Sequence, residues 1–338
     1  MNQQLMQSLL QKVQGSLMLN VAYIGVTNYL FEKLSSMGRA GVEDLAEAAT
    51  IDVGYTRRWC DAAYGFELLE EDDQGRFSLT ELGRAFVPDT VGSLMPFAIQ
   101  SILSAHMADR AAELMRSGER PGEKVLAERS MILPWFGPML EALFGPFLEQ
   151  QILPKVPVYA EINRRQGLAV DLGCGNGWYL RRMAKRYPHL RGIGLDGFEE
   201  NINQASSAAV ADGVAERVSF RTGDIHQFTV DEPVDLIAMN RALHHVWDDK
   251  DNVFRILSEN LRPGGSAVIW EPNWPSDRRL LRDPGYRAMA FQNLSEHIQG
   301  NHFLTSNEIS EAFREVDMEP EVYLFGEGKE VVVVGRKH

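Results

Sequence analysis

A short apolar stretch that runs into three closely spaced glycines limits the possible folds of this chain more than any other feature. Residues 168–172 (LAVDL) are mostly apolar, which is typical of a buried parallel strand. Glycines follow at three alternate positions up to residue 177, and apolar residues then recur at helical spacing from Tyr179. Glycine permits a sharp turn and lets a ligand lie against bare backbone, and a helix N-terminus offers free N–H groups. The stretch therefore predicts a strand, a turn and a helix that together cradle a nucleotide-like ligand.

Strands and helices alternate through the rest of the C-terminal half. We expect further strands at 192–196, 218–220, 234–239 and 266–270, and helices at 199–211 and 249–261. This alternation predicts a parallel sheet with helices on both faces, in which ligands bind beyond the carboxyl ends of the strands. Residues 321–325 and 331–335 are expected to form a C-terminal hairpin.

The composition argues against several classes of partner. The chain has 338 residues and a net charge of −13, and its length suits about two domains. Nucleic acids and anionic membranes attract clustered Lys and Arg, so neither is an expected main partner. Cys60 and Cys174 are too few for a disulfide framework and lack metal-ligand spacing. We expect a cytoplasmic protein, because the N-terminus does not resemble a signal peptide and polar residues interrupt the apolar run at 13–31.

The N-terminal part matches a winged-helix pattern of three helices and a hairpin. One helix is expected to close near Leu34, two more to cover 42–49 and 55–66, and the hairpin to turn at 73–75. Such a module could bind DNA, but residues 31–90 contain 13 acidic and 6 basic residues. This local excess of negative charge is unsuited to contact with phosphates, so we do not expect DNA binding.

The glycine turn reads G-x-G-x-G, with Trp178 where the dinucleotide fingerprint G-x-G-x-x-G has its third glycine. With Asp171 at the end of the preceding strand, the turn resembles motif I of the class I S-adenosylmethionine-dependent methyltransferases. The resemblance implies an α/β fold, a Rossmann-like doubly wound sheet of seven strands that ends in an antiparallel strand. The acidic winged-helix-like segment is similar to the mostly α-helical dimerisation domain of small-molecule methyltransferases, which implies a homodimer.

Three domains follow from this resemblance. Residues 1–90 are the expected dimerisation domain, 91–166 a helical connector, and 167–338 the catalytic domain that binds S-adenosylmethionine. The connector is rich in large apolar residues, most of which we expect in a core or a dimer interface. Alternatively, Trp135, Phe136 and Met139 wall an acceptor pocket, because connecting helices form such a roof in the resembled family. Tyr179 is a further candidate for this pocket.

The predicted cofactor site consists of the glycine turn and of three positions that follow it along the chain, Asp196, Asp224 and Asn240. Asp196 lies 21 residues after Gly175, where a carboxylate can accept both hydroxyls of a ribose. In the resembled family, the position of Asp224 meets the adenine amine, Ile225 packs on the ring, and Asn240 lies near the methionine part. The absence of the third glycine and of a nicotinamide signature argues against NAD. The full predicted set is Asp171, Gly173, Gly175, Gly177, Asp196, Asp224, Ile225 and Asn240.

The residues expected to carry the chemistry follow the fourth strand of this sheet. Methyl transfer from a sulfonium is an in-line displacement, so the protein mainly aligns the acceptor and removes its proton. Histidine is the natural base near neutral pH. In small-molecule O-methyltransferases a Leu-His-Asp-Trp segment carries the base, and His244 matches that histidine, although His245 replaces the aspartate and the tryptophan is displaced by one residue. His245 is the alternative base, and a structural role for both rings is the remaining possibility.

Glu271 ends the fifth strand and is expected to orient His244 or to bind a polar group of the acceptor. Alternatively, Glu271 has only a structural role, in which its carboxylate accepts hydrogen bonds from backbone N–H groups. His297 and His302 are expected at the surface. The sequence contains neither a paired-histidine metal pattern nor a nucleophile elbow, so we expect no metal ion and no covalent intermediate.

The sequence thus predicts an enzyme that methylates a small metabolite, with oxygen as the favoured acceptor and nitrogen or carbon as alternatives. A rival function is chemistry on the methionine arm of the same cofactor, by cyclisation or aminocarboxypropyl transfer. Trp178 and Tyr179 could then hold that arm by sulfonium–π attraction. A third possibility is a winged-helix regulator that senses the cofactor, which the lack of a basic patch disfavours.

Overall fold

The computed structural model describes residues 3–88, 90 and 92–338. The chain forms two compact units. The first comprises Met1–Asp109 and Arg129–Ala142, and the second comprises Arg110–Glu128 and Leu143–His338. The predicted connector, residues 91–166, is thus divided between the two units, and the predicted boundary after residue 90 falls beside residues 89 and 91, which lie outside the described part of the chain.

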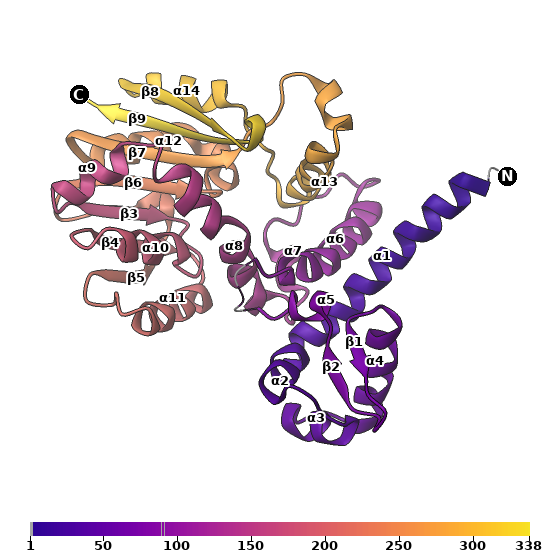
Figure 1. The fold of residues 1–338 in the computed structure, drawn as a ribbon. Helices are drawn as coiled ribbons and strands as arrows, with labels where there is room; N and C mark the ends of the chain where they lie inside the picture. The colour runs from indigo at the N-terminus through magenta and orange to yellow at the C-terminus, as the bar shows by residue number, and fades with distance from the viewer. Residues whose placement is uncertain (1–2, 89, 91) are drawn as a thin grey trace. The chain divides into compact units, whose positions relative to one another are not determined.

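The first unit contains the three helices and the hairpin that the sequence predicts, preceded by one long helix (Figure 1). The hairpin strands pair antiparallel, with Leu69 opposite Leu79. Phe31 and Trp59 meet edge to face in the core, with ring centroids 5.5 Å apart. The elements are α1 (Gln3–Thr27), α2 (Leu30–Met37), α3 (Val42–Ala49), α4 (Val53–Gly65), β1 (Leu69–Glu71), β2 (Phe77–Leu79), α5 (Glu81–Arg84), and the helices α6 (Met95–Leu114) and α8 (Leu133–Phe147), which both continue into the second unit.

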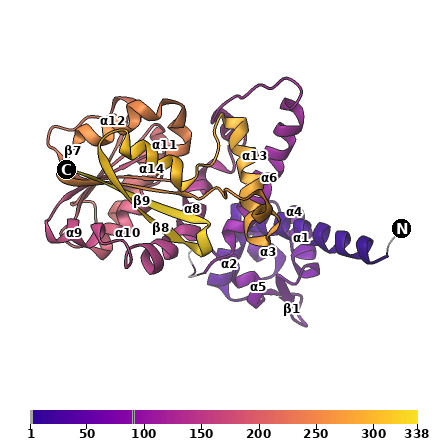
Figure 2. The same ribbon diagram turned by 90° about the horizontal axis from the view of Figure 1, so that it is seen from above.

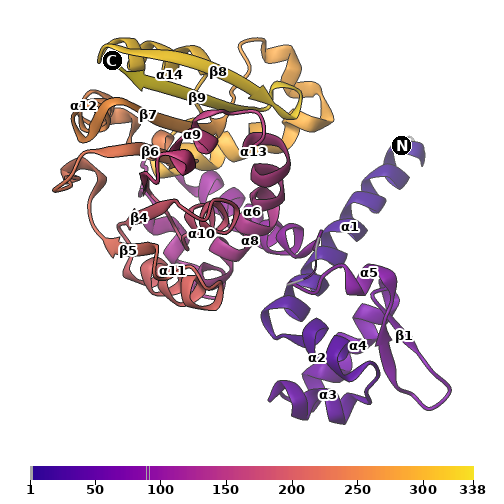
Figure 3. The ribbon, with the colours of Figure 1, turned by 60° about the vertical axis from the view of Figure 1, so that its left-hand side comes forward.

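The second unit is built on a seven-stranded sheet with the order β5-β4-β3-β6-β7-β9-β8. The first five strands in this order are parallel, and β9 runs antiparallel to both of its neighbours. Figure 3 shows β8 and β9 at one edge and β5 at the other. This confirms the predicted Rossmann-like sheet with an antiparallel strand near its end. The strands are β3 (Leu168–Leu172), β4 (Arg191–Asp196), β5 (Val218–Thr222), β6 (Val234–Asn240), β7 (Leu261–Pro272), β8 (Met318–Phe325) and β9 (Glu330–Lys337).

Helices cover both faces of this sheet because neighbouring residues of a buried strand point to opposite faces. Ala169 of β3 packs in the cluster with α9 and α10, whereas Val170 packs in the cluster with α12 and α14. Figure 2 shows the two helix layers on either side of the sheet. The helices of this unit are α7 (Lys124–Ala127), α9 (Val158–Arg164), α10 (Trp178–Arg186), α11 (Glu199–Ala211), α12 (Lys250–Asn260), α13 (Pro284–Gln299) and α14 (Ser306–Arg314), with a π-helical turn at Leu148–Ile152 and short 3₁₀ segments at Ile225–Gln227, Leu243–Asp249, Arg278–Arg282 and Gly326–Gly328.

Two features differ from the predicted elements. Strand β7 begins at Leu261 rather than at residue 266, because the residues after α12 are already extended and Leu261 pairs with Val234 across an irregular stretch. Helices α13 and α14 have no counterpart among the predicted elements, since they lie outside the alternation of strands and helices. Among the described residues, no helix combines the length and the apolar character that a membrane span requires.

The contact between α12 and α14 lies in the hydrophobic core of the second unit. Phe254 is 1% exposed and packs edge to face on Phe313, with centroids 4.9 Å apart. Phe254→Ala leaves a cavity between the helices, so we expect the free energy of unfolding to fall by about 3–5 kcal/mol in urea titrations followed by circular dichroism. Leu324→Ala, at a side chain that is 58% exposed on β8, is the matched control and should cost within about 0.5 kcal/mol. Equal losses in the two variants would contradict this packing.

Candidate functional site

In the glycine turn after β3, the first and third glycines are closely packed against other residues, whereas the second faces open space. All three glycines have positive φ angles, 76° at Gly173, 52° at Gly175 and 72° at Gly177, a conformation that other residues adopt at a cost. A Cβ on Gly173 would lie 2.7 Å from that of Ala242, and one on Gly177 would lie 2.5 Å from the Phe220 ring. A Cβ on Gly175 would meet no atom within 4 Å. The backbone at Gly175 therefore faces open space, where a ligand can approach it closely.

Asp196 at the end of β4 holds this turn in place. One carboxylate oxygen accepts from the Gly175 N–H at 2.8 Å, and the other accepts from the Phe198 N–H and the Asn201 amide, each at 3.0 Å. The pairing of β3 with β4 brings the carboxylate beside the turn. Because each carboxylate oxygen can accept more than one hydrogen bond, Asp196 retains capacity for a ligand hydroxyl.

Asp171 and Asn240 end the adjacent strands β3 and β6 and contact each other. The Asn240 amide donates to Asp171 at 2.8 Å. Asp171 is 1% exposed, and burial raises the pKa of its carboxyl to about 8, with the Asn240 bond opposing the rise and the nearby Asp196 adding to it. The amide oxygen of Asn240 is buried and has no hydrogen-bond partner among the described residues. The pair therefore offers an acceptor and an ionisable carboxyl to a cationic donor.

Asp224 and Ile225 lie in the turn after β5. Asp224 is exposed and caps the short 3₁₀ segment by accepting from the His226 N–H at 2.9 Å. The Ile225 Cδ1 atom lies 3.8 Å from the position that a Cβ of Gly173 would occupy. This turn therefore places an apolar side chain against the glycine turn, with an exposed capping carboxylate next to it in the sequence.

The chain turns sharply where β6 ends. Arg241 has a φ of 56°, in the left-handed region that is unfavourable for a residue with a side chain. Its N–H donates to the Trp270 carbonyl at 2.7 Å, and its guanidinium lies over the Phe144 ring, 4.1 Å from the centroid, while it pairs with Glu330 at 2.8 Å. These contacts compensate the backbone strain and direct the following 3₁₀ segment, which carries the two histidines.

His244 is buried against Glu271, the residue that the sequence offers as its partner. Its Nδ1 lies 2.7 Å from one Glu271 oxygen, and the other oxygen accepts from the Leu243 N–H at 2.8 Å. Burial raises the pKa of the fully buried Glu271, but the His244 and Arg241 side chains outweigh that effect and hold it below its usual value. An ionised Glu271 fixes the imidazole proton on Nδ1 and leaves the lone pair of His244 on Nε2.

His245 has its own carboxylate partner, which the sequence does not reveal. Its Nδ1 lies 3.0 Å from Glu123 and 2.8 Å from the Asn301 side chain. Burial lowers the pKa of His245, but hydrogen bonding to Glu123 and the charges of Glu296 and Glu123 outweigh it and raise the pKa above the usual value. The rings of His244 and His245 are 4.2 Å apart between centroids. Two histidines, each with a carboxylate, thus lie side by side.

Two of the four predicted pocket residues are buried in hydrophobic cores, and the other two are half-buried beside one. Met139 is 2% exposed in the core of the first unit, where Trp135 and Phe136 pack against the same cluster. Tyr179 is 1% exposed in the second unit, and Trp178 beside it packs on the Trp270 ring. Such burial is that of core residues, and neither Met139 nor Tyr179 presents an open surface.

The structure also places the two remaining candidate histidines and reveals contacts that the sequence does not predict. His297 and His302 are exposed, as the sequence predicts. Glu123, Glu296 and Asn301, which face the histidines, are missing from the predicted set. They belong to segments outside the strand–helix alternation, and no spacing in the sequence relates them to residue 245.

Residues 169–265 match the family model of a methyltransferase domain. A trans-aconitate 2-methyltransferase of Streptomyces avermitilis is 31% identical over 156 residues, which are 46% of this chain and 56% of that protein. The match to this relative therefore spans little more than half of its length. The O-methyltransferase SfmM3 of Streptomyces lavendulae is 28% identical over 244 residues, 70% of this chain and 69% of that protein.

Solved structures share the whole fold. Human N-acetylserotonin methyltransferase in complex with S-adenosylmethionine superimposes with a TM-score of 0.70 over 99% of this chain and 98% of that chain, at 17% identity. At this identity the likeness is one of fold. Residues 169–265 are therefore a methyltransferase domain, and the chain as a whole shares its fold with an S-adenosylmethionine-dependent methyltransferase.

Proposed function

We propose that this protein transfers a methyl group from S-adenosylmethionine to an oxygen atom of a small molecule. The observation that carries the proposal is the buried His244–Glu271 pair, whose 2.7 Å contact lies at the same edge of the sheet as the glycine turn. Strands β3, β6 and β7 are neighbours in the sheet. The glycine turn follows the carboxyl end of β3, His244 follows that of β6, and Glu271 lies at that of β7. Ligands of open parallel sheets bind at this edge.

The side chains present suit the cofactor. The open backbone at Gly175 admits the ligand, and Asp196 retains acceptor capacity for the ribose hydroxyls. The exposed Asp224 carboxylate can accept from the adenine amine beside Ile225. The unpartnered Asn240 oxygen and the neighbouring Asp171 carboxyl suit the ammonium group of the methionine part. When bound, the sulfonium supplies the methyl group as an electrophile.

The protein's own task is then to orient the acceptor and to take its proton. Glu271 holds the proton of His244 on Nδ1, so Nε2 is available as the base, the arrangement found where a third group orients a catalytic imidazole. His245 is the second candidate for the base. The relationship to an O-methyltransferase supports an oxygen acceptor, and nitrogen or carbon acceptors remain compatible with the same geometry.

We also propose that the protein forms a homodimer through its first unit. Every residue of α1 from Gln3 to Gln14 is exposed, and an isolated helical segment of this length is marginal in water. Leu10 and Leu17, seven residues apart on α1, are 54% and 49% exposed. Exposed apolar rows of this kind mark interaction surfaces. In Figures 1 and 3, this half of α1 extends beyond α2 and α3.

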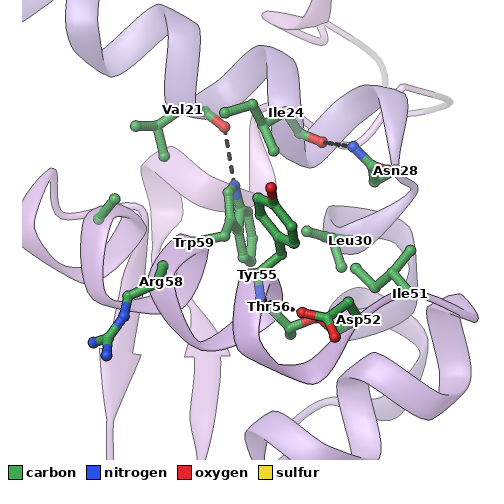
Figure 4. A pocket seen from close by; sticks show the side chains of 11 residues that line it. Val21, Ile24, Asn28, Leu30, Ile51, Asp52, Tyr55, Thr56, Arg58 and Trp59 are labelled. Carbon is green, nitrogen blue, oxygen red and sulfur yellow. Dashed lines mark hydrogen bonds between the residues drawn. The ribbon is translucent and has the colours of Figure 1, made fainter.

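A cavity of about 390 Å³ adjoins the same helix. Figure 4 shows it between α1 and α4, with the Trp59 indole donating to the Val21 carbonyl and the Asn28 amide to the Ile24 carbonyl. Tyr55 and Leu30 contribute further apolar surface to its lining. The apolar row of α1 leads into this cavity, so a second copy of α1 is the occupant that we propose.

The central test is the fate of S-adenosylmethionine. Purified protein should convert it to S-adenosylhomocysteine only when a metabolite extract supplies an acceptor, with mass spectrometry detecting a product heavier by one methylene group. Methylthioadenosine formed without extract would instead establish chemistry on the methionine arm and contradict methyl transfer.

The pH dependence of kcat/KM distinguishes the two histidines. His244→Gln should lower kcat by about 10²- to 10⁴-fold, the range for loss of a general base, whereas the exposed His302→Gln should leave it unchanged. Activity should fall as pH decreases and the base takes up a proton. Glu123→Gln removes the carboxylate that raises the pKa of His245. If His244 is the base, the acidic limb should therefore stay in place, and a shift of that limb to lower pH would assign the base to His245.

The dimer proposal predicts a change in mass. Leu10→Glu combined with Leu17→Glu puts two charges on the apolar row of α1, so light scattering after size exclusion should report a monomer where the unaltered protein is a dimer. Val210→Glu changes a side chain that is 70% exposed on α11 and should leave the mass unaltered. A dimer that survives the double substitution would exclude α1 from the interface.

A further inference from the structure

Three metal-ligating side chains come together from segments far apart in the sequence. His244 and His245 lie in the 3₁₀ segment after β6, and Glu296 lies in the last turn of α13. One ligand atom from each lies within 4.8 Å of the other two. We propose that these three residues bind a divalent transition-metal ion, with Zn²⁺ as the best match. This contradicts the expectation of no metal site, because adjacent histidines and a distant glutamate form no recognisable spacing.

Ligand atoms that lie within 4.8 Å of one another must move closer to bind a single ion. Bonds of about 2.0–2.1 Å to nitrogen or oxygen place neighbouring ligands of a tetrahedral zinc ion roughly 3.3 Å apart. The Nε2 of His244 and an oxygen of Glu296 are 3.8 Å apart. Rotation of the long Glu296 side chain, which is partly exposed, closes this gap without moving the backbone.

Each ligand also has an outer partner that orients it. Glu271 lies 2.7 Å from Nδ1 of His244, and Glu123 lies 3.0 Å from Nδ1 of His245, so both carboxylates hold the ring proton away from Nε2. The Gln299 amide donates to the Glu296 carboxylate at 3.1 Å. Metal-binding histidines usually donate their second N–H to a carboxylate or carbonyl in this way. The cluster thus has both the ligands and the orienting groups of a metal site.

Charge points to a cation. Three glutamates, Glu123, Glu271 and Glu296, converge on two imidazole rings that are neutral when they act as ligands. The Glu271 side chain is fully buried, whereas those of Glu296 and Glu123 are 16% and 41% exposed. Carboxylates that are partly withdrawn from water attract a cation, and an ion bound by Glu296 and the two rings would add positive charge there. Two histidines and one carboxylate are also a ligand set that zinc enzymes use, with a coordination position left open.

The inference rests on methyl transfer to oxygen as the proposed function, but it replaces His244 as the base, because the Nε2 lone pair of His244 would then bind the ion. An acceptor hydroxyl in the open position would lose its proton to water more readily, because a metal ion lowers the pKa of an oxygen ligand. With such an ion bound, the acceptor would give its hydroxyl proton to solvent water, and its oxygen would bond to the methyl carbon as the bond between that carbon and sulfur breaks, with S-adenosylhomocysteine as the leaving group. The site would therefore favour acceptors with an acidic hydroxyl, such as phenols and enols.

The test measures binding separately from activity. Full-length protein without an affinity tag is stripped with a chelator and titrated with Zn²⁺ by calorimetry and with Co²⁺ by visible absorption. We expect one ion per chain and the absorption bands of four-coordinate cobalt. Glu123→Gln should weaken binding about 10- to 100-fold, as loss of an outer partner does. His245→Ala and Glu296→Gln should weaken it further, and the exposed neighbour His297→Ala should bind like the unaltered protein.

Several outcomes would overturn the site. Absence of stoichiometric binding would do so, and so would binding that survives both His245→Ala and Glu296→Gln in proteins with unaltered circular dichroism. Methyl transfer is assayed in parallel on stripped and loaded protein. Full activity of the stripped protein would refute the role of the ion while leaving the proposed function intact. Zinc binding without methyl transfer to any hydroxyl acceptor would refute the proposed function while leaving the site intact.

Discussion

The candidate site depends on the buried carboxylate of Glu271. It is fully buried at the end of β7, yet it accepts hydrogen bonds from the Leu243 N–H and pairs with the His244 ring, so its charge is compensated by groups from the segment after β6. A second, half-buried carboxylate, that of Glu330 on β9, accepts hydrogen bonds from Arg241 and from the Trp270 indole, at 2.8 Å each. Burial raises the pKa of Glu330, and the Arg241 charge opposes the rise.

These two carboxylates sit on paired strands. Glu271 lies opposite Val331 and Glu330 opposite Pro272 in the antiparallel register of β7 and β9. The backbone register of the two strands therefore determines how far apart the two carboxylates lie. Arg241, whose backbone is strained, is held from both sides by contacts to this strand pair. The pairing of β7 with the antiparallel strand β9 therefore helps to determine the direction in which the segment with the two histidines leaves the sheet. A purely parallel sheet would lack this pairing.

Local sequence patterns predict the glycine turn and the residues at the strand ends, but not the other residues of the site. The three glycines of the turn all adopt positive φ, and the mostly apolar strand before them is buried along its full length. The contact of His244 with Glu271 joins the ends of adjacent parallel strands, which topology alone places together. Glu123, Glu296 and Asn301 could not be predicted, because their contacts with the histidines depend on how α13 and the segment near residue 123 pack. No periodicity in the sequence carries that information.

The surroundings of the two histidines differ in how they are connected to the rest of the chain. The partner of His244 belongs to the central sheet, whereas that of His245 belongs to residues 110–128, a part of the second unit whose chain neighbours on both sides belong to the first unit. Gly118 and Gly122, with φ angles of 74° and 79°, form the turn that precedes Glu123. The His244–Glu271 contact is therefore held between neighbouring strands of one sheet, whereas the His245–Glu123 contact depends on a segment outside that sheet. The surroundings of His244 consequently follow from the sheet topology, and those of His245 do not.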